Sequence, residues 1–493
     1  MKIMKFFPWI AALLFCSSIQ TQAQTFDGPL RVHPLNGRYF TDNTGKAIFL
    51  TGSHTWENFQ EIELPGDPPF DWNGYLDMLQ GHHHNFIRLW VWEQAQKTAW
   101  TQDLVQFSPL PYRTVRRNGK TLYDLDQWNE DYFKRLRQRV VEAGQRGIYV
   151  SVMLFQGWSL NKLNNPGADP WESHPMNPAN NVNGVGVSVK NHFEDDAELG
   201  TLHSMKNGDV LARQEAYARK VVESLNDLDN VLYEILNEGG TKDWQYHLIH
   251  FVKNIEKGLS KQHPVGMTHA FVVKPRMFNE DLWNSPADWI SPADEPISFM
   301  YPGSSYLENY KQDPPANAGK KVSILDTDHL WGHGGPAQWV WKSFLRGHQP
   351  IFMDPWQNLA GKLDREKTSW MWVKGGISKD DRNYPDWEPL RLNMGYALGY
   401  AERMNLAAMS PRNDLSTTRY CLANPGEEYL VYFPEGGTAT LDLRGAEGEY
   451  EVEWFIPTLN RTMKGPEPLR GGDFQVVEAP FASGDSVLYL KRD

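Results

Sequence analysis

The chain has 493 residues, 40% of them hydrophobic and 22% charged, with a formal net charge of −12. The length excludes one small domain, and the composition indicates a globular protein rather than a disordered or membrane-embedded one. An acidic chain without a basic run is a poor match for nucleic acid or an anionic membrane, so neither is an expected partner.

The N-terminal segment has the layout of a secretory signal peptide. Two lysines precede an apolar run over residues 6–15, and small residues lead to Ala23, after which cleavage is expected. We therefore predict export to the periplasm or the medium. A cell-surface lipoprotein anchored through Cys16 is disfavoured, because a bulky residue precedes that cysteine. Removal of residues 1–23 leaves Cys421 alone, so no intramolecular disulfide is expected.

Residues 24–410 alternate between apolar runs and helical patterns. After a hairpin that turns at Asn43-Thr44-Gly45, the expected elements are strand 47–56, helix 72–81, strand 85–93, helix 126–147, strand 148–158, helix 214–225, strands 230–240, 264–268, 288–291 and 321–328, helix 335–347, strand 350–356 and helix 389–404. Asp126 is the expected N-cap of the second helix, and Pro336 is expected near the N1 position of the fourth. Eight strands mostly separated by helices indicate a (β/α)8 TIM barrel.

Residues 411–493 have a different texture. Short apolar runs are separated by Gly, Pro and Asn turns without a helical period, which predicts a small C-terminal β-sandwich. The Asn-, Gly- and Pro-rich segment 159–212 is too long for a mere connector and is expected to roof the site.

In a (β/α)8 barrel the active site lies at the carboxyl ends of the strands, so polar residues at those ends are the candidates for function. They are His54, Trp56, Glu57, Arg88, Trp90, Trp92, Glu93, Gln156, Trp158, Asn237, Glu238, His269, Asp326, Asp328, Asp354 and Trp356. Many of the 20 tryptophans stand beside polar residues, which suits stacking against sugar faces as well as core packing.

The stretch YEILNEGG ends the fourth predicted strand with Asn237-Glu238. In this order and spacing the barrel resembles the retaining (β/α)8 glycoside hydrolases of clan A. It resembles most closely the bacterial apiosidase-like glycosidases, which carry a small collagenase-like C-terminal β-domain. The stretches NGRYFTDNTGKAIFL and NFIRLWVWE are also similar. The resemblance implies that Glu238 is the general acid/base, that Asn237 binds a substrate 2-hydroxyl, and that strand 321–328 ends with the nucleophile.

Two carboxyl groups suit glycoside cleavage, because one protonates the leaving oxygen while the other stabilises or attacks the anomeric carbon. The clan normally has Glu on the seventh strand, whereas this chain has Asp326 and Asp328, two apart and thus expected on one strand face. Asp328 lies nearer the strand end and is the predicted nucleophile. Since Asp is one methylene shorter than Glu, either the backbone approaches the sugar more closely or the carboxyl groups stand further apart, which would favour inversion.

The remaining candidates are predicted to bind substrate or to support the site. Asp326 is expected one layer deeper, as an orienting residue or a partner of Arg88, whose buried guanidinium needs a carboxylate. The predicted substrate-binding residues, besides Asn237, are Arg88, His54, Trp56, Glu57, Trp90, Trp92, Glu93, Trp158, Asp326, His329, Trp331, Asp354 and Trp356. The predicted function is hydrolysis of glycosidic bonds in a plant or algal polysaccharide or its oligosaccharides, with a carbohydrate as partner and no cofactor.

Two alternatives stay open. Asp326, Asp328, His329 and His333 lie within eight positions, so a metal-dependent (β/α)8 hydrolase would take ligands from this cluster, with His54 or His269 as a further ligand. However, metal-dependent barrels of the amidohydrolase type usually have a His-x-His pair on the first strand, and here GSHTW has a single histidine. The other alternative is a non-catalytic glycan-binding barrel, against which the two strand-end carboxylates argue.

Overall fold

The structure, a computed structural model, describes residues 26–63, 69–97, 106–160, 169–187, 202–270, 277–295, 308–332, 334–354, 356 and 387–492. The predicted signal peptide and His333 lie outside these residues, so both remain sequence-based predictions. Among the described residues, no helix is long and apolar enough to cross a membrane.

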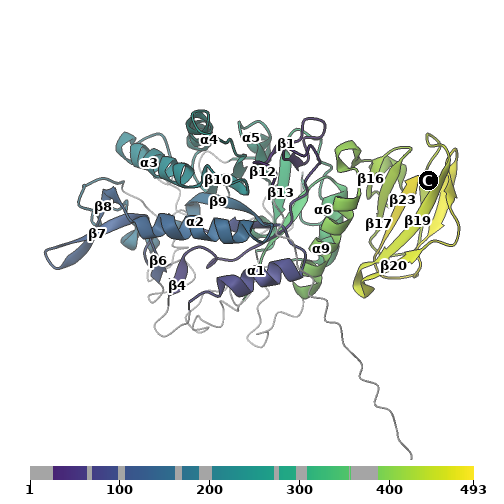
Figure 1. Ribbon diagram of the computed structural model, residues 1–493, viewed down its shortest axis with the longest axis horizontal. Helices are drawn as coiled ribbons and strands as arrows, with labels where there is room; N and C mark the ends of the chain where they lie inside the picture. Colours follow the sequence, from purple (N-terminus) through teal and green to yellow (C-terminus); the bar gives the residue numbers. More distant parts are fainter. Residues whose placement is uncertain are drawn as a thin grey trace, which may run out of the picture.

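Eight parallel strands close into a barrel, which confirms the predicted fold class (Figure 1). In chain order, which is also their order around the barrel, they are β3 (Gly52–His54), β5 (Phe86–Leu89), β9 (Tyr149–Gln156), β10 (Val231–Asn237), β11 (Val265–Thr268), β12 (Trp289–Ser291), β13 (Val322–Asp326) and β14 (Gln349–Met353). Each lies within or beside a predicted strand. The observed strands are mostly shorter, because the backbone leaves the ladder where the polar strand-end residues begin.

Helices follow most of the strands and cover the outside of the barrel (Figure 1). They are α1 (Trp72–Gly81), α2 (Glu130–Gly144), α3 (Gly208–Leu225), α4 (Lys242–Glu256), α5 (Asn279–Trp283), α6 (Ala337–Leu345) and α9 (Glu388–Arg403). Helices α4 and α5 were not predicted, and α3 begins six residues before its predicted start at Gln214.

The predicted start of the second helix is wrong. Asp126 belongs to strand β8 (Lys120–Trp128), which pairs with β7 (Tyr112–Arg117) in a hairpin between β5 and α2. The N-cap of α2 is instead Asn129, whose side chain accepts a hydrogen bond from the Asp131 N–H. Pro336 is the N-cap of α6 and thus lies next to N1, close to its predicted position.

The barrel interior is apolar at its lower end, where the strands begin. Phe86, Leu232, Trp289, Val322 and Ile351 meet there and are completely buried. The N-terminal segment closes this end, since Leu30 and Phe40 join the same cluster; strands β1 (Arg31–Val32) and β2 (Phe40–Thr41) pair in that segment. The polar residues of the interior therefore lie toward the opposite end, where the strands finish.

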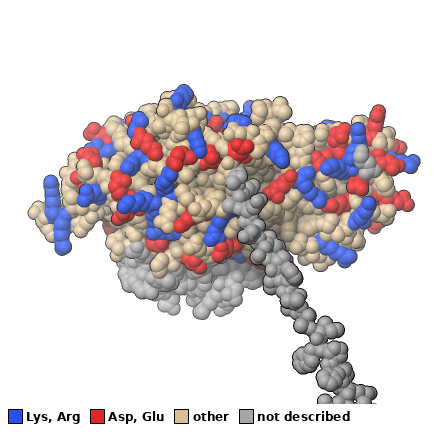
Figure 2. All heavy atoms as spheres, viewed as in Figure 1, with Lys and Arg blue, Asp and Glu red and all other residues tan. Residues whose placement is uncertain are grey.

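The C-terminal region forms antiparallel sheets, as predicted. The larger sheet contains β15 (Ser410–Pro411), β16 (Cys421–Asn424), β17 (Glu428–Phe433), β23 (Ser486–Arg492), β19 (Glu449–Ile456), β20 (Arg461–Lys464) and β21 (Leu469–Arg470). The smaller one pairs β18 (Thr438–Asp442) with β22 (Phe474–Glu478). Side chains of both sheets share one core, which includes Leu441, Val477 and Leu488. On the face shown in Figure 2, acidic and basic side chains are interspersed over the barrel and these sheets.

The barrel and the C-terminal sheets share an aromatic contact. Trp341 of α6 is completely buried, and its indole N–H donates to Asn393 Oδ1 of α9 at 2.7 Å. Its ring lies 6.2 Å from that of Tyr432 and 6.1 Å from that of Phe455, both in the larger C-terminal sheet. This contact makes the C-terminal sheets part of the main hydrophobic core.

We expect Trp341→Ala to lower the free energy of unfolding by about 3–5 kcal/mol, because it leaves a cavity between barrel and sheet and removes the donor to Asn393. Urea denaturation followed by circular dichroism would measure the loss. Leu459→Ala is the control, since Leu459 is 56% exposed and its removal should change stability by no more than about 0.5 kcal/mol. A loss below about 1 kcal/mol for Trp341→Ala would contradict this account of the contact.

Candidate active site

Two carboxyl groups from distant parts of the chain meet at the upper end of the barrel. Glu238 directly follows β10, and Asp328 lies just after β13. With His329, each contributes an atom to a group in which all the atoms lie within 4.8 Å of one another. The nearest oxygens of the two carboxyl groups are therefore close enough to act on the same sugar carbon and its leaving oxygen.

The backbone at Glu238 has an unusual conformation. Its φ is +51°, in the left-handed region that residues with a side chain rarely occupy, and its side chain is only 4% exposed. Gly157, at the end of the neighbouring strand, packs against it so closely that a Cβ there would stand 2.4 Å from the Glu238 carbonyl oxygen. The indole N–H of Trp158 donates to Glu238 Oε2. Close packing thus fixes the direction of this carboxyl group.

Arg88 is the centre of a buried ion cluster beneath the two carboxyl groups. Its Nε donates to Glu234 Oε2 at 2.8 Å, and its Nη1 donates to Asp326 Oδ2 at 2.5 Å. Its Nη2 donates to Glu234 Oε1 at 2.5 Å and to Asn237 Oδ1 at 2.7 Å. All these side chains are at most 1% exposed. The guanidinium therefore ties β5 to β10 and β13 at one level of the barrel.

Asp326 and Asp328 do not share a strand face, contrary to the prediction. Strand β13 ends at Asp326, and residues Thr327–His329 form a turn of 3₁₀ helix. The cause is local: Asp326 Oδ1 accepts the backbone N–H of Asp328 at 2.9 Å and so caps the turn. Asp326 also accepts His54 Nε2 at 2.9 Å. Asp326 is thus held by three donors, whereas the buried Oδ2 of Asp328 has no hydrogen-bond partner among the described residues.

The three carboxyl groups differ in acidity. Burial, with the nearby charge of Asp328, raises the pKa of Glu238 well above its usual value. Burial and the charge of Asp326 likewise raise the pKa of Asp328 to about 6. Burial acts in the same direction on Asp326, but the charges of His54 and Arg88 outweigh it and hold its pKa below the usual value. At neutral pH the site therefore has a carboxyl group suited to remain protonated, Glu238, next to ionised ones.

A chain of hydrogen bonds orients Asn237. Its amide nitrogen donates to Gln156 Oε1 at 3.2 Å, and its Oδ1 accepts from Arg88. His329 Nε2 lies 3.2 Å from the same Oδ1, so this nitrogen must be the protonated one, and Nδ1 accepts from the Ser291 hydroxyl at 3.1 Å. Burial lowers the pKa of His329 well below its usual value, which keeps the ring neutral.

The predicted tryptophans separate into two groups. Trp90 lies in the interior, where its ring stacks on His54 at 4.9 Å and contacts the Arg88 guanidinium. Trp92 and Trp56 are buried together, the Trp92 indole N–H donating to the Trp56 carbonyl at 3.0 Å. These three indoles are thus almost inaccessible to a sugar in this structure. Among the predicted tryptophans the half-buried ones are Trp158, Trp331 and Trp356.

Three predicted acidic residues lie at the edge of the site: Asp354 and Glu57 are buried, and Glu93 is half-buried. Glu93, which follows β5, contacts two histidines of the segment 159–212. It accepts a hydrogen bond from His203 Nε2 at 2.9 Å and lies 3.6 Å from His174. Burial alone would raise the pKa of Glu93, but these histidines lower it to about 2.

Asp354 accepts both Nε and Nη2 of Arg391 on α9, at 2.8 and 2.6 Å, and is completely buried. Glu57 is also completely buried. In this structure neither Asp354 nor Glu57 presents an accessible carboxylate.

Two residues that bond to the candidate site residues were not predicted: Glu234, which pairs with Arg88, and Ser291, which pairs with His329. Glu234 has a visible signal: it is the only charged residue in the strand VLYEILN, all of which is buried, and such a carboxylate needs a cationic partner. Ser291 ends the short strand β12 and leaves no signal beyond that position.

A metal ion is the alternative occupant of this centre. Glu238, Asp328 and His329 offer one ligand atom each within the 4.8 Å span. The predicted ligand set differs, because it contained Asp326, which binds Arg88 and His54 instead of joining the group. His333, the fourth residue of that set, lies outside the described residues.

Comparison with known families identifies the barrel. The model described as "Apiosidase-like, catalytic domain" matches residues 35–290, just over half of the chain. The chain belongs to the apiosidase-like family. It is a glycoside hydrolase with a TIM-barrel catalytic domain. The matched range includes Glu238 but ends before β13 and Asp328. The C-terminal sheets lie outside it, so their resemblance to a collagenase-like domain stays a prediction.

Solved structures share this architecture. One described as a glycoside hydrolase has a TM-score of 0.57 at 12% identity, over 95% of this chain and 99% of the other. A glycoside hydrolase family 5 protein from Bacteroides vulgatus ATCC 8482 has a TM-score of 0.57 at 13% identity, over 94% of each chain. At these identities the likeness establishes the fold. Among curated proteins, no significant match is found.

Replacing Arg88 tests the ion cluster. We expect Arg88→Met to destabilise the protein by about 3–5 kcal/mol, because two carboxylates remain buried without their cation. The triple variant Arg88→Met, Glu234→Gln, Asp326→Asn should recover a large part of that loss, since it buries no unpaired charge. Urea denaturation of both variants would measure the difference. The cluster would not have the role described here if Arg88→Met alone were as stable as the unmodified protein.

Proposed function

We propose that this glycoside hydrolase cleaves its substrate with Glu238 as general acid/base and Asp328 as nucleophile, with retention of anomeric configuration. The observation that carries the proposal is the close approach of the two carboxyl groups, whose nearest oxygens lie within 4.8 Å. Carboxyl groups about 5–5.5 Å apart leave no room for a water between sugar and carboxylate, whereas inverting enzymes need about 6.5–9.5 Å. The shorter aspartate side chain is offset by its place on the turn after β13.

Asp328 is proposed as the nucleophile in preference to Asp326 because the two carboxyl groups differ in their hydrogen-bond partners. Asp326 is held by Arg88, His54 and the Asp328 N–H, so its oxygens are committed to the protein. Asp328 is only partly buried, and its Oδ2 has no hydrogen-bond partner among the described residues, so this carboxyl group is less committed to the protein. Asn237, oriented by Arg88 and Gln156, is proposed to bind the sugar hydroxyl next to the reacting carbon.

The proposed reaction has two steps. Glu238 gives its proton to the glycosidic oxygen while Asp328 attacks the anomeric carbon, which forms a glycosyl ester and releases the leaving alcohol. Glu238, now ionised, takes a proton from water, and that water breaks the ester and restores Asp328. We further propose a plant or algal polysaccharide or its oligosaccharides as substrate, and export of the chain by the N-terminal segment. Support for the latter is the layout of residues 1–23.

Substitution of each carboxyl group tests these roles. Glu238→Gln and Asp328→Asn should each lower kcat by about 10²–10⁴-fold on a cleaved glycan, without loss of folding. Added azide should restore turnover to Asp328→Ala and yield a glycosyl azide, because the small anion replaces the missing nucleophile. Asp442→Asn, in the C-terminal sheets, is the matched control and should keep full activity. Near-full activity of both Glu238→Gln and Asp328→Asn would exclude the assignment.

The acidities predict a bell-shaped pH profile. Asp328 must be ionised to attack, and its pKa is raised to about 6, so kcat/KM should rise as the pH increases through about 6. Glu238 must be protonated, and its pKa is raised, so kcat/KM should fall again at higher pH as it loses its proton. Initial rates across the pH range on one soluble substrate would show both limbs. A profile that stays flat through pH 6 would contradict the proposed role of Asp328.

The second candidate function, a metal-dependent hydrolase, is favoured by the grouping of Glu238, Asp328 and His329. A chelator distinguishes the two. The two-carboxylate mechanism predicts that activity survives dialysis against EDTA and is unchanged by added Zn²⁺. Loss of activity with EDTA that Zn²⁺ restores would instead support the metal-dependent reaction.

A further inference from the structure

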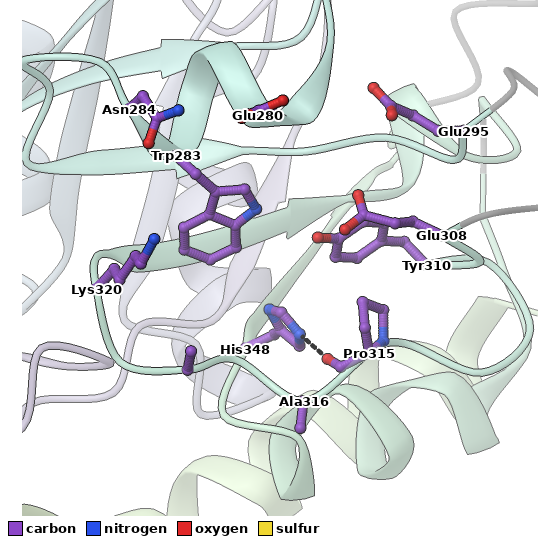
Figure 3. Close-up of a pocket in the computed structure, with 11 residues that line it drawn as sticks. Glu280, Trp283, Asn284, Glu295, Glu308, Tyr310, Pro315, Ala316, Lys320 and His348 are labelled. Carbon is purple, nitrogen blue, oxygen red and sulfur yellow. Dashed lines mark hydrogen bonds between the residues drawn. The ribbon is translucent and has the colours of Figure 1, made fainter.

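A separate cavity of about 390 Å³ lies on the flank of the barrel, between α5 and the segment that leads into β13 (Figure 3). The strands around it explain its origin. Residues 308–321, the described part of the connection that leads into β13, contain no helix, so loop residues line this side of the cavity. None of the lining residues belongs to the carboxyl centre of Glu238 and Asp328.

The indole of Trp283 is the largest side chain that lines this cavity. It is half-buried at the end of α5 and packs against the main hydrophobic core, which limits its movement. Figure 3 shows the ring among the lining side chains, with Lys320 and Asn284 on one side and Glu308 and Tyr310 on the other. The ring is only partly buried against the core and borders the cavity, where a ligand can contact it (Figure 3).

Polar side chains with unused hydrogen-bonding capacity surround the indole. Glu308 accepts Asn279 Nδ2 at 2.8 Å through Oε2, and its Oε1 has no partner among the described residues. The side chains of Glu280, Asn284 and Lys320 are exposed and make no hydrogen bond or ion pair within the described part of the chain. The cavity therefore combines an aromatic face with acceptors and donors on opposite sides.

We propose that this cavity is a second, non-catalytic saccharide-binding site that takes one or two sugar rings of a neutral glycan. A sugar has an apolar C–H face that stacks on an indole and a rim of hydroxyl groups that both donate and accept, which matches the arrangement of Trp283, Glu308 and Lys320. A purely apolar ligand would bury the carboxylates without partners, and a carboxylated ligand would meet the negative charges of Glu280, Glu295 and Glu308. The volume lies within the range of small-ligand sites.

The inference rests on the proposed function only in taking a glycan as ligand. Its role is to hold the enzyme on a polymer while the carboxyl centre acts elsewhere on the same material. A glycan held at two points on the enzyme dissociates more slowly than a glycan held at one point, because the second contact forms at high effective concentration.

Affinity electrophoresis tests the site. The Glu238→Gln, Asp328→Asn variant, which cannot digest the gel, is run in native gels that contain arabinoxylan, galactomannan or arabinogalactan. We expect retardation in at least one of them, and a further Trp283→Ala substitution should weaken that retardation at least fivefold. Phe474→Ala is the control, since it removes an aromatic side chain that is 49% exposed on the C-terminal sheets.

A second variant guards against misfolding of Trp283→Ala. Glu280→Ala with Lys320→Ala changes only exposed side chains and should weaken retardation about threefold, whereas the exposed pair Glu435→Ala with Lys491→Ala should not. The inference is overturned if the parent is retarded in no gel, or if the Trp283 and Glu280/Lys320 variants migrate like it. These outcomes do not depend on hydrolysis. Weaker retardation of the Trp283 and Glu280/Lys320 variants supports the flank site even if the enzyme cleaves no glycan. If the enzyme cleaves a glycan but these variants are retarded as strongly as the parent, only the proposal of the flank site is excluded.

Discussion

The buried guanidinium of Arg88 is the constraint on which the upper half of the barrel depends. An arginine inside a barrel must be neutralised and fully hydrogen-bonded, and here Glu234, Asp326 and Asn237 meet those requirements from two other strands. The same hydrogen bonds fix the register of β5, β10 and β13 relative to one another. Because Glu238 directly follows β10 and Asp328 lies two residues after β13, the positions of these two carboxyl groups depend on the layer below them.

This arrangement also decides which aspartate remains available. Asp326 balances Arg88, accepts His54 and caps the turn that carries Asp328, so a single side chain joins the structural layer to the reactive one. The turn takes Asp328 off the strand, and its carboxyl group lies within 4.8 Å of that of Glu238.

The barrel could be predicted from the sequence because its strands are apolar on both faces. The place of Asn237-Glu238 at the end of the fourth strand could be predicted too, whereas the catalytic roles of the site residues stay predictions. Two further elements were predictable from sequence patterns. Helix α4 has apolar residues at a helical period, and Asn118-Gly119 is a typical hairpin turn between β7 and β8. The left-handed backbone of Glu238 could not be predicted, since it depends on Gly157, a close neighbour in space from another strand. Burial of Trp92 and pairing of Asp354 with Arg391 likewise depend on tertiary contacts.

The central claim is that Glu238 and Asp328 are close enough for the aspartate itself to attack the sugar. The most direct measurement is ¹H NMR of the hydrolysis of a cleaved oligosaccharide, recorded before the product mutarotates. The account predicts that the first anomer to accumulate has the configuration of the bond that was broken. First accumulation of the opposite anomer would contradict it, because a water held between sugar and carboxylate would then be the attacking group.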